Sequence, residues 1–306
     1  MKKILILLCF TYLTIYSQQV SVVDEVRITN IEDGRFFYPL VSPDGGKVLV
    51  TSGDYKGLWI KDLNTGITRQ LNNAAGAGYE PQFDQSGSEI IYRSDKFVNG
   101  KRYSSLFVQN IKSKETLNLE KDVRNLYPAK AVKGNSNVYL KNDVMKKYTP
   151  AKTLSKSGKD IPAAYIENSR IALFIDGEKK ILTPLGEGNY IWPSVSPDGE
   201  KLLFTVAGRG TYVSDLEGNI ISDLGYANYP SWSRDGKWIV FMEDYDDGYV
   251  ITSSEIGVVS ADGSSRFMLT ESPDRIELYP KWSPAADEIV FHTDKGEIYK
   301  LTLMIN

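Results

Sequence analysis

The sequence predicts an all-β protein in which repeated four-stranded antiparallel sheets close into a ring. Three observations predict this fold. A short aromatic-proline motif recurs six times, strand-like segments follow each copy, and the last repeat lacks a strand that the N-terminal segment can supply. The 306-residue chain is 42% hydrophobic and 25% charged, which is typical of a folded globular protein.

The repeated motif is an aromatic residue, a proline and, a few residues later, Ser-Pro-Asp-Gly. It is clearest at 38–45, 192–199 and 229–236, and weaker at 79–87, 127–129 and 279–284. Pro-Asp-Gly forms turns because proline presets φ, aspartate bonds back to the backbone and glycine accepts positive φ. The anchor prolines, which predict six units, are Pro39, Pro81, Pro128, Pro193, Pro230 and Pro280.

Each unit continues with three strand-like segments. The second strands are continuously apolar, as expected for strands buried on both faces, at 48–50, 90–92, 138–140, 202–204, 238–241 and 289–291. Third strands are expected at 58–63, 106–109, 171–175 and 211–215, and fourth strands at 67–71, 116–119, 180–183, 220–224 and 267–270. Four short antiparallel strands per 37 to 65 residues are typical of a propeller blade.

The two ends of the chain complement each other. The sixth unit reaches 298–301 without a fourth strand, and residues 26–29 match the fourth-strand pattern. Pairing between these segments would remove two open sheet edges. The predicted fold is therefore a six-bladed β-propeller over residues 18–306, with four antiparallel strands per blade, closed by the N-terminal strand in the last blade.

Residues 1–17 are predicted to form a signal peptide. Lys2 and Lys3 precede an apolar stretch at 4–15, and Ser17 offers a small residue at a cleavage point. An uncleaved anchor is the alternative, although a membrane helix needs about 20 apolar residues. Cys9 leaves with this peptide, so the mature chain is expected to carry no disulfide and no transmembrane segment. The predicted location is the periplasm, the cell surface or the medium.

The repeat resembles the Pro-x-Trp-Ser-Pro-Asp-Gly core of the TolB-like family of six-bladed propellers, a WD-like repeat, over about residues 22–303. The resemblance implies a propeller in the periplasm or at the surface. TolB itself resembles a periplasmic adaptor between envelope proteins, with an α/β domain before its propeller. Only about 20 residues separate the signal peptide from the first anchor here, so that domain is expected to be absent.

Composition narrows the function classes. The chain has one histidine, His292, and one cysteine, Cys9, so a zinc site of several His or Cys is excluded and any triad base must be His292. The net charge is −3, so nucleic acid is not an expected partner. We expect a monomer, and we expect His292 to be structural.

The aromatic residues before the anchors are the first candidate site, because a radial repeat gathers them near the mouth of a central channel. They are Tyr38, Tyr79, Tyr127, Trp192, Tyr229 and Tyr279. Such a ring can stack on sugar faces or grip an extended peptide; alternatively, it packs between blades. Glu80, beside Tyr79, and Arg209 are charged candidates for the same binding face, and Arg35 and the polar segment 93–103 also supply cations.

Two irregular segments depart from the repeat. The acidic loop 243–248 places Asp244, Asp246 and Asp247 where oxygen ligands suit calcium; alternatively, it is a solvated loop. The long third unit carries lysines at 141, 146, 147, 152, 156 and 159, which suit an acidic partner or a solvated loop. No other cofactor is predicted.

The predicted function is that of a secreted, non-enzymatic propeller. It would bind a protein, peptide or glycan partner in the cell envelope through the channel mouth and loops. The alternative is a propeller enzyme, a lyase or hydrolase acting on a polysaccharide, with carboxylates or a metal in the channel. Asp44, Asp198 and Asp235 are already explained by the turns, and a hydrolase domain after the propeller is not expected.

Overall fold

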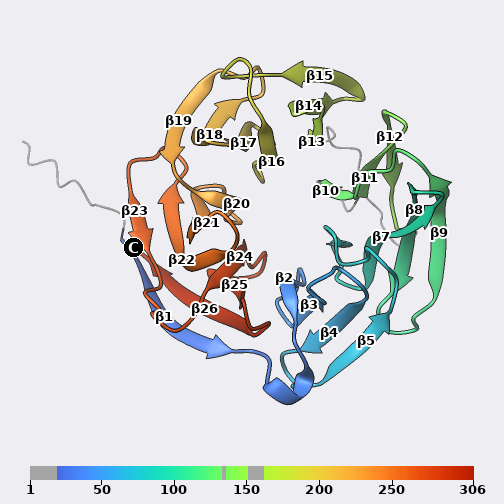
Figure 1. The fold of residues 1–306 in the computed structure, drawn as a ribbon, viewed down its shortest axis with the longest axis horizontal. Helices are drawn as coiled ribbons and strands as arrows, with labels where there is room; N and C mark the ends of the chain where they lie inside the picture. Colours follow the sequence, from blue (N-terminus) through green and yellow to red (C-terminus); the bar gives the residue numbers. More distant parts are fainter. Residues whose placement is uncertain (1–18, 133–135, 151–161) are drawn as a thin grey trace, which may run out of the picture.

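The computed structural model describes residues 19–132, 136–150 and 162–306. Within them, antiparallel sheets stand side by side around a central axis (Figure 1). Five sheets have four strands and two have three. The predicted all-β propeller of antiparallel blades is confirmed. The predicted signal peptide, 1–17, lies outside the described residues.

Four sheets follow the chain strand by strand. The first contains β2 (Phe37–Val41), β3 (Lys47–Thr51), β4 (Leu58–Asp62) and β5 (Thr68–Asn72), preceded by the short 3-10 helix η1 (Ile31–Asp33). The second contains β6 (Gln82–Phe83), β7 (Glu89–Val98), β8 (Lys101–Asn110) and β9 (Thr116–Val123). Another contains β16 (Tyr190–Val195), β17 (Lys201–Val206), β18 (Gly210–Asp215) and β19 (Ile220–Gly225). The next contains β20 (Asn228–Trp232), β21 (Trp238–Asp246), β22 (Ile251–Ser260) and β23 (Arg266–Met268).

The last sheet joins the two ends of the described chain. It contains β24 (Glu277–Trp282), β25 (Glu288–Thr293), β26 (Ile298–Ile305) and, outermost, β1 (Val20–Arg27). β1 runs antiparallel to β26, as the blue and red strands at the lower left of Figure 1 show. Val26 pairs with Lys300 and Arg27 with Tyr299, and the Ile28 amide donates to the Ile298 carbonyl at 2.7 Å. The predicted closure of the ring is confirmed.

The segment between Pro128 and Pro193 departs from the predicted four-stranded unit. It forms two three-stranded sheets, β10 (Lys130–Val132), β11 (Ser136–Lys141) and β12 (Val144–Tyr148), then β13 (Ala163–Glu167), β14 (Arg170–Ile175) and β15 (Glu178–Leu182). The described residues therefore form seven sheets in all. β13 starts directly after Pro162, which lacks the repeated motif because Ile161, not an aromatic residue, precedes it.

The predicted basic insertion is partly regular structure. Lys141, Lys146 and Lys147 belong to the β11–β12 hairpin, and the Lys141 ammonium pairs with Glu120 at 2.6 Å. Lys152, Lys156 and Lys159 lie outside the described residues.

The hydrophobic core lies between neighbouring sheets, and the second strand of a sheet contributes to both of its sides. In β3, Val48 and Val50 pack against Val290 and Ile298 of the last sheet. Leu49, between them, packs against Ile90 of the following sheet. Burying such side chains contributes roughly 1.5–3 kcal/mol each. The predicted burial of the second strands on both faces is confirmed.

The motif aspartates close the turn after the first strand. The backbone amides of Gly46, Glu200 and Lys237 donate to Asp44, Asp198 and Asp235 at 3.1 Å in each case. In the first of these turns the hydrogen bond from the Ser42 hydroxyl holds the pKa of Asp44 at about 2. The predicted turn role of these aspartates is confirmed.

A search of the described part of the chain for a membrane-crossing helix finds none of sufficient length and apolar character.

A candidate ligand-binding channel

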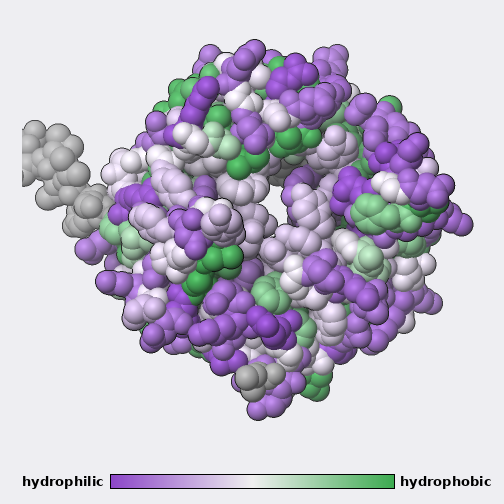
Figure 2. Space-filling model, in the orientation of Figure 1, coloured by the Kyte–Doolittle hydropathy of each residue, from purple (hydrophilic) through white to green (hydrophobic). Residues whose placement is uncertain are grey.

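A cavity of about 600 Å³ lies where the first strands of several sheets meet. Figure 2 shows an opening at the centre of the ring. The lining comes from the aromatic-proline segments at the start of β2, β6, β16, β20 and β24, with Lys130 of β10. The cavity is therefore built by the repeated motif itself.

A bulge in the first strands turns the motif residues inward. The residue before the anchor proline has a left-handed backbone at Tyr38 (φ 53°), Trp192 (φ 52°), Tyr229 (φ 50°) and Tyr279 (φ 55°). The strand register shifts at the same places in β2, β16, β20 and β24. Left-handed φ costs a non-glycine residue on the order of 1–3 kcal/mol, and a bulge redirects a side chain. The motif thus keeps a strained conformation that presents an aromatic ring to the cavity.

Six aromatic rings form a continuous chain along the cavity wall, which we call the aromatic girdle. In order of contact they are Tyr79, Tyr55, Tyr38, Tyr279, Tyr229 and Trp192. Successive ring centroids lie 5.5, 4.4, 4.8, 4.5 and 5.7 Å apart. Every ring of the girdle both lines the cavity and packs against a neighbour.

The girdle agrees with the sequence prediction except at two positions. Tyr127, the sixth predicted member, packs against Tyr165 at 5.7 Å and does not line the cavity. Tyr55, from the loop between β3 and β4, takes part although it lies outside the repeat. Only the fold brings Tyr55 against Tyr38, so the repeated motif could not predict that Tyr55 belongs to the girdle.

Three charged side chains line the cavity. The Lys130 ammonium pairs with Glu80 at 2.7 Å. The Lys281 ammonium lies 4.8 Å from the centre of the Tyr229 ring and, within the described chain, has no carboxylate within ion-pair distance. Burial lowers the pKa of Lys281 to about 8, with Glu80 acting in the opposite direction. Burial also opposes ionisation of Glu80, but Lys130 holds the Glu80 pKa below its usual value.

Two of these groups replace the residue that the repeat normally supplies. Glu80 occupies the left-handed position before the anchor proline (φ 51°), where Tyr38, Trp192, Tyr229 and Tyr279 stand in other sheets. Lys281 follows its anchor proline, where Ser194 and Ser231 follow theirs. Sequence reasoning named Glu80 but missed Lys130 and Lys281. The contrast between Pro-Lys-Trp-Ser at 280–283 and Pro-Ser-Trp-Ser at 230–233 is the feature that could have revealed Lys281.

Glu80→Gln should lower the pKa of Lys281 below about 8, because Glu80 is the anion that favours the charged ammonium. The pKa is measured from the pH dependence of Lys281 acetylation by trace acetic anhydride, read by mass spectrometry. The exposed Lys237 serves as the internal control. An unchanged or raised Lys281 pKa in the variant would show that Glu80 does not act on this amine.

His292 supports the girdle from outside the cavity lining. Its ring stacks on Tyr279 at 5.2 Å and meets Tyr38 edge-on at 5.1 Å. The side chain is buried, and its Nδ1 lies 3.0 Å from the Thr293 carbonyl. Burial lowers the pKa of His292 to about 4. These contacts fit the structural role predicted for it.

The acidic segment forms the tip of the long β21–β22 hairpin. Asp246 accepts the Gly248 amide at 2.8 Å, Asp247 accepts the Tyr249 amide at 2.9 Å, and Asp244 accepts the Asn228 amide group at 2.8 Å. Within the described ranges no group of three or more His, Cys, Asp or Glu is placed to hold a metal ion. The structure thus gives the three candidate calcium ligands a different role, in closing and anchoring the hairpin.

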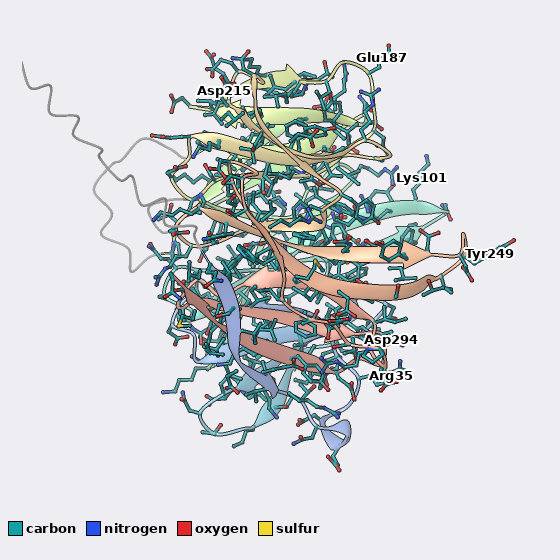
Figure 3. All side chains as sticks on the ribbon, turned by 90° about the vertical axis from the view of Figure 1, so that its left-hand side faces the viewer. Arg35, Lys101, Glu187, Asp215, Tyr249 and Asp294 are labelled. Carbon is teal, nitrogen blue, oxygen red and sulfur yellow. The ribbon has the colours of Figure 1, made fainter. Side chains whose placement is uncertain are left out.

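The predicted surface cations are held by backbone groups. Arg209 donates to the carbonyls of Leu185 and Glu187 at 3.0 and 2.8 Å, and it does not line the cavity. Arg35 similarly donates to the Lys295 carbonyl at 2.9 Å. Figure 3 shows Arg35, Glu187 and Asp294 on the same side of the ring as the hairpin residues Lys101 and Tyr249, with Asp215 on the other side.

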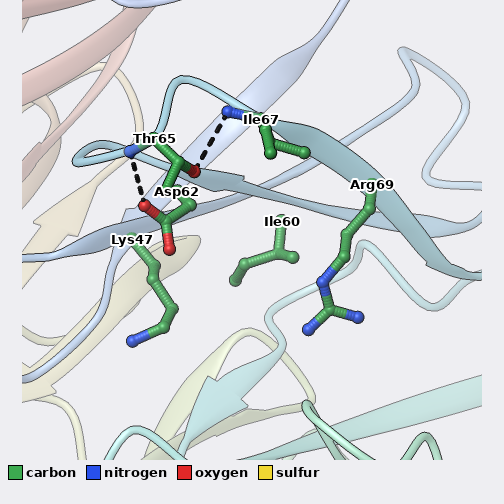
Figure 4. A pocket seen from close by; sticks show the side chains of 6 residues that line it. All are labelled: Lys47, Ile60, Asp62, Thr65, Ile67 and Arg69. Atoms are coloured by element: carbon green, nitrogen blue, oxygen red, sulfur yellow. Dashed lines mark hydrogen bonds between the residues drawn. The ribbon is translucent and has the colours of Figure 1, made fainter.

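A second, smaller cavity of about 240 Å³ lies on the first sheet (Figure 4). Its charged side chains are already engaged. Asp62 accepts the Thr65 amide at 2.9 Å, Lys47 pairs with Asp44 at 3.1 Å, and Arg69 donates to the Ile111 carbonyl at 2.5 Å. We therefore assign the candidate site to the axial cavity.

The fold and the axial cavity define a β-propeller with a channel-like site. No family model matches the sequence, and no curated protein matches it. Among solved structures, TolB from Acinetobacter baumannii superposes with a TM-score of 0.53 at 16% identity, over 81% of this chain. This chain spans only 57% of the length of that TolB chain.

Two further structures share the architecture. The Cps50 (Swd1) β-propeller domain from Myceliophteria thermophila gives a TM-score of 0.60 at 11% identity, over 93% of this chain and 99% of that one. An oligogalacturonate lyase in complex with manganese gives 0.51 at 14% identity, over 88% and 78%. These likenesses show a TolB-like, WD40-like propeller fold.

Proposed function

We propose that this protein is a non-enzymatic propeller of the cell envelope that binds a protein, peptide or glycan partner at its axial cavity. The aromatic girdle carries the proposal. A continuous wall of tyrosine and tryptophan offers large apolar contact areas with polar tips, which is the composition of binding hot spots. The envelope location rests on the signal-peptide pattern at 1–17.

The charges of the cavity support binding over polysaccharide cleavage. Cleavage by paired carboxylates needs two of them across the scissile bond. Glu80 is the carboxylate among the residues that line the cavity, and it is paired with Lys130. A single ion-paired carboxylate suits recognition of a ligand better than acid/base work.

The decisive experiment compares ligand binding by a variant that loses aromatic rings in the girdle with binding by a variant that loses an aromatic ring on the exposed hairpin. Trp192→Ala with Tyr229→Ala removes adjoining rings of the girdle, and Tyr249→Ala removes a ring that is 95% exposed on the β21–β22 hairpin. Peptide and glycan arrays are probed with each purified protein. We expect the girdle variant to lose at least tenfold in affinity for whatever wild type binds, and the hairpin variant to bind normally. Equal binding by all three proteins would refute the channel as the site.

The enzyme alternative has one observation in its favour. Lys281, with a pKa near 8, is poised where a general base works at neutral pH. Release of new reducing ends or unsaturated products from polysaccharides, abolished by Lys281→Met, would replace the binding proposal with an enzymatic one. We expect no turnover.

A further inference from the structure

The cavity has an excess of positive charge, although the whole chain has a net charge of −3. Its charged lining consists of two lysines and one glutamate, and Lys130 already neutralises Glu80. Lys281 is the remaining charge, and its ammonium contacts the Tyr229 ring rather than a carboxylate. A cation held in a partly buried, partly apolar site without an anion is costly unless a ligand supplies one.

Two neutral polar atoms on residues that line the cavity have no hydrogen-bond partner among the described residues. Trp282 follows Lys281 directly, is 7% exposed, and has a buried indole Nε1–H with no acceptor among the described residues. The Ser194 hydroxyl is likewise buried and unpartnered within the same residues. Indole can only donate, and a buried donor left unpaired costs about 1–3 kcal/mol. Both atoms are closed off in this structure, so Lys281 is the donor that a ligand in the cavity meets directly.

From this unpaired positive charge we infer that the axial cavity recognises a carboxylate on a peptide, with Lys281 as the anion-binding group. The inference rests on the proposed function and deepens it by naming the chemistry of the ligand. A carboxylate supplies both the negative charge and the acceptor lone pairs that the Lys281 ammonium lacks in this cavity.

A peptide fits the girdle better than a sugar. Sugar rings bind by stacking on open aromatic faces, but one face of several girdle rings is already covered by other side chains of the protein. Tyr38 and Tyr55 stack on each other, and Lys281 covers one face of Tyr229. Arg93 covers a face of Tyr79 at 5.2 Å. The ring edges and faces that stay open suit an extended peptide with a charged end or side group better than a flat sugar ring.

Binding should depend on pH through Lys281. The groups that face its ammonium are Glu80, Lys130 and the Tyr229 ring. A bound carboxylate adds a negative charge, so it should raise the pKa of Lys281 above its free value of about 8. Affinity should therefore be constant at neutral pH and fall as the pH rises past that value.

The test uses two hexapeptide pools of random sequence, one with free carboxyl termini and one with amidated termini, each made with and without Asp and Glu. Retention on immobilised protein is measured for wild type, Lys281→Met and Lys237→Met, the last removing an exposed lysine on a turn. Oligomers of galacturonic acid form a separate arm. Circular dichroism melting confirms that each variant is folded.

We expect wild type and Lys237→Met to retain carboxylate-bearing peptides at least tenfold better than amidated, Asp- and Glu-free ones, and Lys281→Met to lose this preference. Retention by the free-terminus pool alone assigns the terminal carboxylate; retention whenever Asp or Glu is present assigns the side chain. Equal preference in Lys281→Met overturns the inference. Retention of neutral peptides that is lost in the Trp192→Ala, Tyr229→Ala variant overturns the inference while sparing the proposed function. Retention of galacturonate alone overturns the peptide class, and no retention of any probe overturns both.

Discussion

Val20→Asn should lower the free energy of unfolding by about 3 kcal/mol, because it places an amide in the core that closes the ring. Val20 is 6% exposed and belongs to the cluster that joins β1 to the last two sheets. Val23→Asn, on the same strand but 55% exposed, should change stability by less than about 0.5 kcal/mol. Urea unfolding of both variants measures the difference. Equal effects would mean that β1 adds nothing through burial.

Removal of residues 19–27 should have a larger consequence of a different kind. β26 would lose its antiparallel partner from Val20 to Arg27 and become an open edge in an otherwise closed ring. Open edges template pairing with other chains. We expect the shortened protein to self-associate in size-exclusion chromatography, in proportion to its concentration. A shortened chain that elutes as wild type does would show that the β1–β26 pairing is dispensable.

His292 should make the protein less stable in mild acid. Burial lowers its pKa from 6.5 to about 4, so the unfolded chain takes up a proton at a higher pH than the folded one. Protonation of His292 therefore has little effect on the free energy of unfolding above about pH 6.5. Below that pH it lowers this free energy progressively, until the pH reaches about 4. Between about pH 7 and pH 5 the loss should be about 2 kcal/mol.

The matched variant is His292→Phe, which keeps an aromatic ring against Tyr279 and Tyr38 but cannot take up a proton. Its absolute stability will differ from wild type, so the measured quantity is the change in unfolding free energy between the two pH values. We expect wild type to lose about 2 kcal/mol more than the variant over this range. The same loss in both proteins would assign the pH dependence to other groups.

The regular four-stranded units were predictable because the residues that determine their turns and strands lie close together in the sequence. The turn at 42–45 is encoded by residues that hydrogen-bond within the turn itself, and the apolar second strands differ plainly from their neighbours. The segment from Pro128 to Pro193 was not predictable as two sheets. Pro162 has neither an aromatic residue before it nor a Pro-Asp-Gly turn after it. The sequence that forms β13 and β14 therefore carries no copy of the repeated motif.

The candidate site was predictable only in part. Five of the six predicted aromatic residues line the cavity, and four of them do so because the bulge before the anchor proline repeats with the motif. Tyr79 stands one position earlier, beside Glu80. Tyr55 and Lys130 come from positions that the motif does not include, and they reach the cavity only because neighbouring sheets meet at the axis. Lys130 and Glu80 are 50 residues apart in the sequence and belong to neighbouring sheets, so no local sequence pattern predicts their contact.

The sequence by itself determined the strand-forming repeat, its turns and the complementarity of the two ends, because each rests on contacts within a few residues or on a repeated pattern. Only the tertiary structure decided which side chains share the axial cavity and which charge stays without a partner. That outcome depends on the radial placement of whole sheets, which sets Lys130 beside Glu80 and leaves Lys281 against the Tyr229 ring. Residues from separate sheets meet only when the closed ring brings their first strands together.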